Sequence, residues 1–236
     1  MNVRVVLVGI EGAVNLGVII RTCKNFEVEE IYLVKPVASL EEASRYVAKA
    51  DDYLRNKVCV VGELSEAIKD VDLVVATSAK GYSLGDILRQ AISIQDFLET
   101  IKGRNTRLAI LFGRESTGLT RDELEKADIL VTIPASPEYP VLNVSQAVSI
   151  FLWELWKLYG REASNIPPRA SRDEINELIN IIRSITGLAF TSKDKLDKLV
   201  FTWRRVIYRS NPSKYEVRLL TYWSRRVYNR LKKQYS

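Results

Sequence analysis

The sequence predicts an α/β domain with a mainly parallel sheet over residues 1–160, followed by a small all-helical domain over residues 171–236. Two patterns support this division. In the first part, continuous apolar runs alternate with amphipathic segments, which is typical of parallel strands buried on both faces and of the helices that cover them. The second part shows only helical periodicity. Residues 161–170, which carry two adjacent prolines, are predicted to form a linker.

Six strands are expected in the first part, because six short runs are apolar and rich in β-branched residues. They cover residues 3–9, 31–34, 57–61, 73–76, 107–112 and 129–133. Two helices are expected to begin after Ser39 and Thr120, and the others cover residues 15–26, 64–69 and 143–159. Ser39 and Thr120 each start a capping box, in which a hydroxyl and a carboxylate three residues later bind free amides of the first helical turn.

The second part is expected to contain three helices, at residues 171–185, 193–209 and 214–233. Ser171 begins a third capping box at the start of the first of them. On the last helix, Trp223, Val227 and Leu231 recur at helical spacing. We therefore expect these three side chains to pack into the core of the helical domain.

Composition argues against several classes of protein. The chain has no histidine and two isolated cysteines, Cys23 and Cys59, so we expect no metal site and no nucleophile activated by histidine. No apolar run is long enough to cross a bilayer, and the N-terminus lacks the pattern of a signal peptide. We therefore expect a cytoplasmic protein that is not bound to a membrane.

Charge is distributed unevenly along the chain. Residues 1–160 contain 18 basic and 22 acidic residues, for a net charge of −4, whereas residues 161–236 contain 17 and 7, for a net charge of +10. A solvated helical surface is the ordinary explanation of such an excess. A basic domain joined to an acidic one also suits contact with a polyanion, and we expect nucleic acid.

The first candidate motif runs from Asn15 to Arg21, directly after the first strand. An arginine inside this helix can point into the crevice at the carboxyl edge of the sheet, where α/β proteins bind ligands. The alternative is that Asn15 caps the helix and that Arg21 is solvated.

The second motif, Gly113-Arg-Glu115-Ser-Thr-Gly118, turns the chain at the end of a buried strand. Gly113 permits close approach of the backbone to a ligand, and Glu115 could orient a cationic partner. The segment lacks the Lys-Ser/Thr end of a phosphate-binding GxxxxGK[ST] loop. The alternative is an ordinary turn between a strand and a helix.

The third motif spans residues 133–147 and places a proline-rich loop before a long helix. Free amides and carbonyls in such a loop can read an adenine edge and a ribose without charged side chains. The alternative is a proline-stiffened connector in which Asn143 caps the helix.

In this order and spacing, the three motifs resemble those of the SpoU (TrmH) branch of the SPOUT methyltransferases, and most closely the archaeal TrmJ enzymes. The resemblance is detailed over residues 2–160. It implies a deep trefoil knot formed by the C-terminal part of the α/β domain, bound S-adenosylmethionine, and a homodimer whose active site is completed at the subunit interface. It also implies methylation of the ribose 2′-hydroxyl at position 32 of the tRNA anticodon loop.

The resemblance also implies roles for individual residues. Arg21 would be the leading catalytic residue, with Asn15, Glu115, Asn143 and Ser145 beside it. Lys80 would contact RNA, although bacterial relatives typically have arginine at this position. The cofactor pocket would be formed by Thr77, Ser78, Ala79, Leu111, Gly113, Ile133, Pro140, Val141, Leu142 and Asn143.

A ribose hydroxyl is a poor nucleophile, and its proton must leave as the methyl group arrives. The protein must therefore align the reacting atoms and stabilise the developing oxyanion. An arginine side chain stays protonated at neutral pH, which suits Arg21 to binding an oxyanion or a phosphate rather than to acting as a base. The proton acceptor is then a water, Tyr139 or an RNA phosphate.

The basic tail interleaves arginines with aromatic residues, a composition that can bind phosphates and stack on bases. We expect the arginines to contact mainly RNA phosphates, which gives affinity and salt dependence rather than sequence specificity. These residues are Arg204, Arg205, Arg209, Arg225, Arg226 and Arg230.

Three other functions are consistent with parts of the sequence. A ribosomal RNA 2′-O-methyltransferase would carry the same motifs. A non-catalytic RNA-binding protein could keep the fold, but the intact Arg21, Glu115, Asn143 and Ser145 argue against it. A nucleotide-dependent oxidoreductase would need a GxGxxG turn after the first strand, and the sequence has none there.

Overall fold

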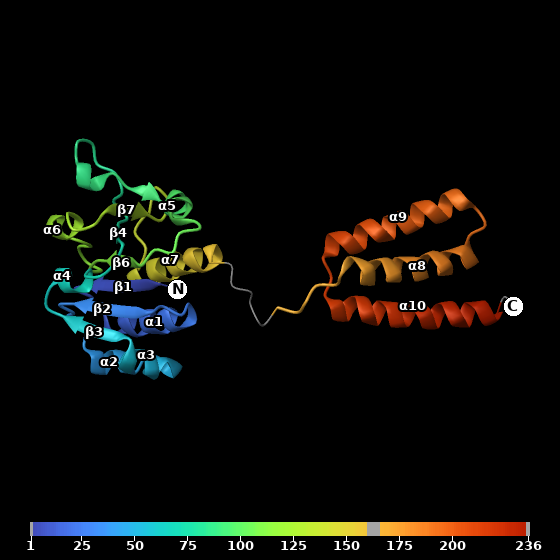
Figure 1. The fold of residues 1–236 in the computed structure, drawn as a ribbon, viewed down its shortest axis with the longest axis horizontal. Helices are drawn as coiled ribbons and strands as arrows, with labels where there is room; N and C mark the ends of the chain where they lie inside the picture. Colours follow the sequence, from blue (N-terminus) through green and yellow to red (C-terminus); the bar gives the residue numbers. More distant parts are fainter. Residues whose placement is uncertain (1, 160–165, 235–236) are drawn as a thin grey trace. The chain divides into compact units, whose positions relative to one another are not determined.

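The computed structural model describes residues 2–159 and 166–234. The chain divides into two compact units, Met1–Arg161 and Glu162–Ser236. Figure 1 shows a helix-covered sheet in the first unit and long helices in the second. Residues 161–165 of the predicted linker lie outside the described residues.

The first unit is built on a parallel sheet of seven strands in its described part, in the order β3-β2-β1-β6-β4-β7-β5. The predicted sheet is confirmed, but the expected number of six strands is wrong. The missed strand, β5, has two residues at the sheet edge, too few to show a pattern. The strands are β1 (Val3–Val8), β2 (Glu30–Val34), β3 (Val58–Val61), β4 (Leu73–Thr77), β5 (Ile92–Ser93), β6 (Leu108–Phe112) and β7 (Ile129–Thr132).

Most helices of this unit lie where the sequence predicts them, and α3 and α5 were not predicted. In α5, the apolar residues Ile94, Phe97, Leu98 and Ile101 are all buried and have helical spacing, so this pattern could have revealed the helix. The helices are α1 (Ala13–Asn25), α2 (Leu40–Ser44), α3 (Asp51–Asn56), α4 (Leu64–Ala67), α5 (Ile94–Ile101), α6 (Arg121–Leu124) and α7 (Val144–Leu158).

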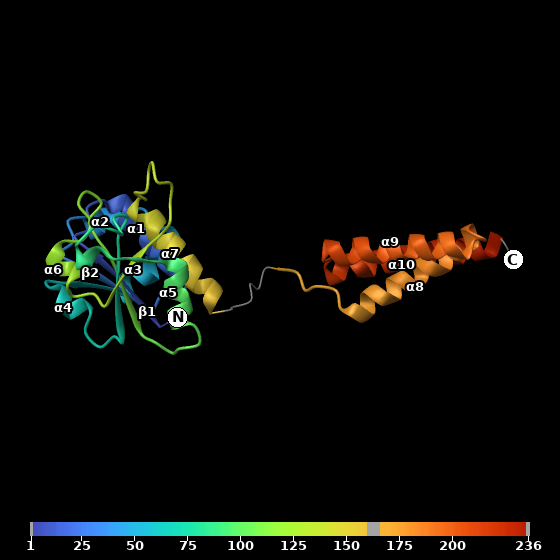
Figure 2. The same cartoon turned by 90° about the horizontal axis from the view of Figure 1, so that it is seen from above.

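Both faces of the sheet are covered, because neighbouring residues of a strand point to opposite sides. In β1, Val5 and Leu7 pack into the cluster formed with α1, α5 and α7, whereas Val6 and Val8 face α4 and α6. Figure 2 shows α4 and α6 on one side of the sheet and α5 and α7 on the other. Fully buried Phe151 joins α7 to this core.

The strand order places a topological switch point between β1 and β6. The chain leaves β1 through α1 toward β2, whereas it leaves β6 through α6 toward β7 on the other side. The loops after β1 and β6 therefore diverge, and crevices of this kind bind ligands in open α/β sheets. The first sequence motif lies in α1, directly after the loop that follows β1, and the second lies in the loop after β6.

The second unit consists of α8 (Arg172–Ala189), α9 (Lys193–Ser210) and α10 (Lys214–Gln234), packed around a small apolar core. The expectation that Trp223 is a core residue is wrong, since its side chain is 60% exposed. The buried face of α10 carries Val217, Thr221 and Ser224 instead, so small side chains lie next to α8. Val227 and Leu231 are half-buried.

The last residues of the predicted linker belong to the helical unit. The amide of Ala170 donates to the carbonyl of Pro212 (3.0 Å), and the amide of Lys214 donates to the carbonyl of Pro168 (2.8 Å). Among the described residues, the structure has no helix with the length and apolarity needed to cross a membrane.

Candidate functional site

Glu115 lies at the switch point and binds the N-terminus of α1. One carboxylate oxygen accepts hydrogen bonds from the amide of Gly12 (3.1 Å) and from Nδ2 of Asn15 (2.9 Å), and the other accepts from the amide of Glu11 (2.9 Å). A negative charge at a helix N-terminus is favourable because the free amides there carry partial positive charge. Glu115 therefore binds amide groups in the described part of the chain, and its orientation of a cationic partner stays a prediction.

A continuous set of hydrogen bonds joins the three motifs. Nδ2 of Asn143 donates to Oδ1 of Asn15 (3.1 Å), and Asn15 in turn donates to Glu115. The hydroxyl of Ser145 donates to Oδ1 of Asn143 (2.7 Å), which also accepts from the amide of Ser145 (2.8 Å). Four of the five predicted catalytic residues are thus directly connected. Asn143 caps α7, but Asn15 lies inside α1, where Gly12 is the N-cap.

Arg21, the fifth residue, lies on a different side of α1. Six residues separate it from Asn15, which corresponds to a rotation of about 120° round the helix. Its exposed side chain shares a face with the exposed Val14, seven residues earlier. Helix α7 borders this face, where the hydroxyls of Thr22 and Ser149 lie 3.4 Å apart.

The residues predicted to bind the cofactor follow the carboxyl ends of three adjacent strands, β4, β6 and β7, or precede α7. The hydroxyl of Thr77 donates to the carbonyl of Leu111 (2.9 Å), and the amide of Ser78 donates to the carbonyl of Val131 (3.1 Å). Leu111 is fully buried, so its side chain offers no surface to a ligand. Exposed or half-buried positions are Thr77, Ser78, Ala79, Gly113, Ile133, Pro140, Val141, Leu142 and Asn143.

The close approach at Gly113 is made by the chain itself. A Cβ atom at this position would lie 2.2 Å from the carbonyl carbon of Gly118 and 2.4 Å from the amide nitrogen of Leu119. Gly113 therefore lets the turn fold back tightly on its own backbone. The predicted approach of a ligand to the backbone of Gly113 stays a prediction.

The acid stability of the protein is expected to depend on Glu115. Burial raises the pKa of Glu115, but hydrogen bonds from Asn15, Glu11 and Gly12 outweigh it and hold the pKa below the ordinary value of 4.5. When folding lowers the pKa of a carboxyl group, the ionised group stabilises the fold fully at pH values above its unfolded-state pKa. This stabilisation is lost as the pH falls through the folded-state pKa. Wild-type protein should therefore be more stable than Glu115→Gln at neutral pH, and this difference should shrink below about pH 4.5.

Urea unfolding of both proteins between about pH 7 and pH 3 would measure this difference. Other carboxylates titrate in both proteins, so only the gap between the two curves reports on Glu115. A gap of constant size over the whole range would contradict the role given to the ionised carboxylate.

The six arginines predicted to bind RNA are all exposed on α9 and α10. Arg204 lies over the ring of Tyr208 (5.7 Å to the centroid), and Arg226 lies over that of Tyr222 (5.3 Å). Arg225 instead forms an ion pair with Glu177, which partly neutralises it. The remaining arginines and several aromatic rings are also exposed on these two helices.

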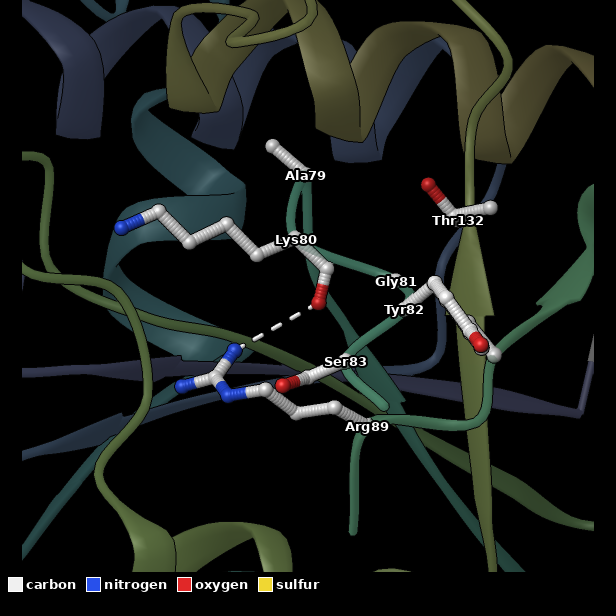
Figure 3. Close-up of a pocket in the computed structure, with 8 residues that line it drawn as sticks. Ala79, Lys80, Gly81, Tyr82, Ser83, Arg89 and Thr132 are labelled. Atoms are coloured by element: carbon white, nitrogen blue, oxygen red, sulfur yellow. Dashed lines mark hydrogen bonds between the residues drawn. The ribbon is translucent and has the colours of Figure 1, made fainter. Parts of the chain in front are cut away.

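The sequence motifs did not reveal a pocket beside the carboxyl ends of β4 and β7. It has a volume of about 640 Å³ and is lined mainly by the segment that joins β4 to β5. Figure 3 shows Lys80 and Arg89 on one side of this pocket and Tyr82 and Thr132 on the other. Of these four residues, only Lys80 was predicted to be functional.

Comparisons with known proteins place these features in context. The SpoU rRNA Methylase family matches residues 2–153. A tRNA (cytidine-2′-O-)-methyltransferase TrmJ from Sulfolobus acidocaldarius is 38% identical over 99% of this chain and 97% of its own length. The protein of the same description from Methanocaldococcus jannaschii is 30% identical over 75% and 77%. The crystal structure of TrmJ from Z. mobilis has a similar fold, with a TM-score of 0.63, 24% identity and coverage of 92% and 95%.

Proposed function

The chain belongs to the SpoU rRNA Methylase family, and from this premise we propose that it methylates the 2′-hydroxyl of a ribose in tRNA with S-adenosylmethionine. The relatives described as acting on cytidine favour a cytidine substrate. Position 32 of the anticodon loop is the proposed target. The observation that carries the proposal is the hydrogen-bonded connection of Glu115, Asn15, Asn143 and Ser145, because it unites three motifs far apart in the sequence.

The residues at the carboxyl edge fit the proposed cofactor. Val141 is 53% exposed, and among the described residues neither its amide nor that of Leu142 has a hydrogen-bond partner. Free amides beside aliphatic side chains can bind an adenine ring and its polar edge. We place the cofactor against Thr77–Ala79, Ile133 and Pro140–Leu142, where it would supply an electrophilic methyl group on a sulfonium.

The side chains of the site are suited to holding the ribose. The proton of the Ser145 hydroxyl is committed to Asn143, so its oxygen remains available as an acceptor. We propose that this oxygen accepts a hydrogen bond from the ribose hydroxyl and fixes its orientation. Arg21 would stabilise the developing oxyanion or bind a neighbouring phosphate, because a protonated guanidinium can do either.

We also propose that the enzyme is a homodimer with its site completed across the interface. Val14 is 51% exposed and Trp153 is 50% exposed on the face that α1 and α7 share with Arg21. We propose that these apolar side chains form part of a contiguous patch that a second copy of the chain covers. Burial of this face would place Arg21 next to a second subunit. The trefoil knot stays a prediction.

The helical unit is proposed to hold the tRNA through the phosphate groups, since its exposed arginines and net charge of +10 over residues 161–236 suit a polyanion. An enzyme acting on tRNA would work in the cytoplasm, which is our proposed location. No metal is part of the proposal.

Methyl transfer from labelled S-adenosylmethionine would test this function, with unmodified tRNA and a ribosomal RNA fragment as parallel substrates. A 2′-O-methylated linkage resists nuclease, so the modified site can be mapped. Label at position 32 of tRNA is expected. Label only in the ribosomal RNA fragment would support the proposed reaction but contradict tRNA as its substrate. Transfer to neither RNA would contradict the proposal.

A further inference from the structure

The segment that joins β4 to β5 folds on itself, and we call residues 80–91 the β4–β5 projection. Tyr82 and Gln90 form an antiparallel bridge, and the amide of Ala91 donates to the carbonyl of Gly81 (2.7 Å). Figure 1 shows the projection extending beyond the ends of β4 and β7. Its internal hydrogen bonds give it a defined shape rather than that of an open loop.

Gly81 fixes the base of the projection against the sheet. A Cβ atom at this position would lie 2.9 Å from the Cβ of Ala91 and 3.1 Å from that of Thr132, at the end of β7. Tyr82 follows this tightly packed point directly, so its backbone is well anchored. Its side chain is nevertheless 70% exposed, and among the described residues its hydroxyl has no hydrogen-bond partner. The backbone of Tyr82 is thus anchored, while its ring is open to solvent.

Positive charge is in excess around this pocket. The guanidinium of Arg121 lies 2.8 Å from the carboxylate of Asp86, and that of Arg89 lies 3.8 Å from it. Two arginines therefore share one carboxylate. Lys80 adds a third cation, which forms no ion pair in the part of the chain that the structure describes. The surroundings of the pocket thus combine an open aromatic ring with uncompensated cations.

This combination matches one nucleotide of a single-stranded RNA, whose base stacks on aromatic rings and whose phosphate binds cations. The pocket volume of about 640 Å³ is within the usual range for ligand sites. Ala79 belongs both to the pocket and to the predicted cofactor segment, and Thr132 directly precedes Ile133. A nucleotide bound here would therefore lie next to the proposed cofactor site.

We propose that this pocket binds a nucleotide next to the methylated one, with its base stacked on Tyr82 and its phosphate against Lys80 and Arg89. The inference rests on the proposed function, since it assigns this site to the same RNA. Tyr82 would act as a positioning residue: by holding the neighbouring base outside the loop stack, it presents the target ribose to Ser145 and Arg21.

The test uses the full chain and an anticodon stem–loop RNA with 2-aminopurine at each position flanking nucleotide 32. Tyr82→Phe keeps the ring, whereas Tyr82→Leu keeps only the apolar bulk. Leu84→Ala is the matched control, because Leu84 lies on the same projection, is 89% exposed and does not line the pocket. RNA affinity, 2-aminopurine fluorescence and S-adenosylmethionine affinity are measured for each protein.

Tyr82→Leu is expected to bind the RNA about 5- to 150-fold more weakly, since one aromatic stacking partner is lost. It should also lose a quenching of 2-aminopurine fluorescence at one flanking position, which Tyr82→Phe and Leu84→Ala retain. S-adenosylmethionine affinity should be equal in all four proteins. RNA binding by Tyr82→Leu equal to that of wild type, or a change in cofactor affinity alone, would overturn the inference.

Failure of the proposed function gives a different result. Wild-type protein that binds the RNA with ring-dependent quenching but transfers no methyl group would contradict the methyltransferase proposal and leave the nucleotide site standing. Normal methylation that does not depend on the Tyr82 ring would contradict the nucleotide site and leave the methyltransferase proposal standing. Wild-type protein that binds no RNA would overturn both.

Discussion

Replacement of Arg21 by alanine is expected to lower methyl transfer to tRNA by about two to three orders of magnitude, the cost of losing one oxyanion-stabilising group. The side chain is exposed, and among the described residues it has neither an ion pair nor a hydrogen bond. Its donors are therefore free for the substrate, and its removal should not weaken the fold. Single-turnover rates at saturating tRNA would measure the effect.

Arg21→Lys provides the sharper comparison, because it keeps the charge and loses the planar pair of donors. A partial rate is expected from this variant, and thermal unfolding should be the same for all three proteins. Nearly full turnover with unchanged pH dependence in Arg21→Lys would show that the guanidinium has no specific role.

The position of Arg21 on a different side of α1 from Asn15 also predicts complementation between inactive subunits. Arg21→Ala and Asn143→Ala homodimers should both be inactive. If Arg21 acts in its partner's site, a mixed dimer contains one site with both residues, and mixing should restore about a quarter of wild-type activity. Mixed dimers without activity would place Arg21 in the site of its own subunit.

Gly113→Ala is expected to cost about 3 kcal/mol of folding free energy, at the upper end of the range for overpacking. The new Cβ would meet the backbone of Gly118 and Leu119 rather than a movable side chain. Leu119 is buried in the core, and the turn is closed by a hydrogen bond from the Gly118 amide to the Arg114 carbonyl (2.9 Å). Neither segment can therefore move without loss of these contacts. Urea unfolding would measure the loss.

Gly62→Ala is the matched control for this prediction. A Cβ at Gly62 would meet only the carboxylate of Glu66, at an ordinary contact distance of 3.7 Å. Its unfolding free energy should stay close to that of wild type. Equal stability of Gly113→Ala and Gly62→Ala would mean that the turn after β6 adapts easily.

Local patterns in the sequence predicted most of the fold, because most strands and all long helices carry their own pattern of apolar residues. β1 could be predicted from its apolar run, and α1 from apolar residues at helical spacing, such as Leu16, Ile19 and Ile20. Trp223 was misplaced because spacing fixes the period of a helix but not which face turns inward. That choice depends on α8, whose contact with α10 favours the small residues Thr221 and Ser224.

The candidate site was harder to predict, because its contacts join distant parts of the chain. Asn15 and Glu115 are 100 residues apart, and Asn15 and Asn143 are 128 apart. Resemblance to a family singled out these residues but not their partners. The second motif suggested a cationic partner for Glu115, whereas the structure gives it three amide donors. The pocket beside Tyr82 had no motif, since its shape arises from the packing of Gly81 against β7.

The hydrogen bonds that join Ser145 to Glu115 all run in one direction. Ser145 donates to Asn143, Asn143 to Asn15, and Asn15 to the carboxylate. In such a polarised chain each bond strengthens the next, so electron density from Glu115 is passed on toward the serine oxygen. The enzyme can thereby make Ser145 a stronger acceptor for the ribose hydroxyl while the anionic charge itself stays at the helix terminus, away from the repelling phosphates of the RNA.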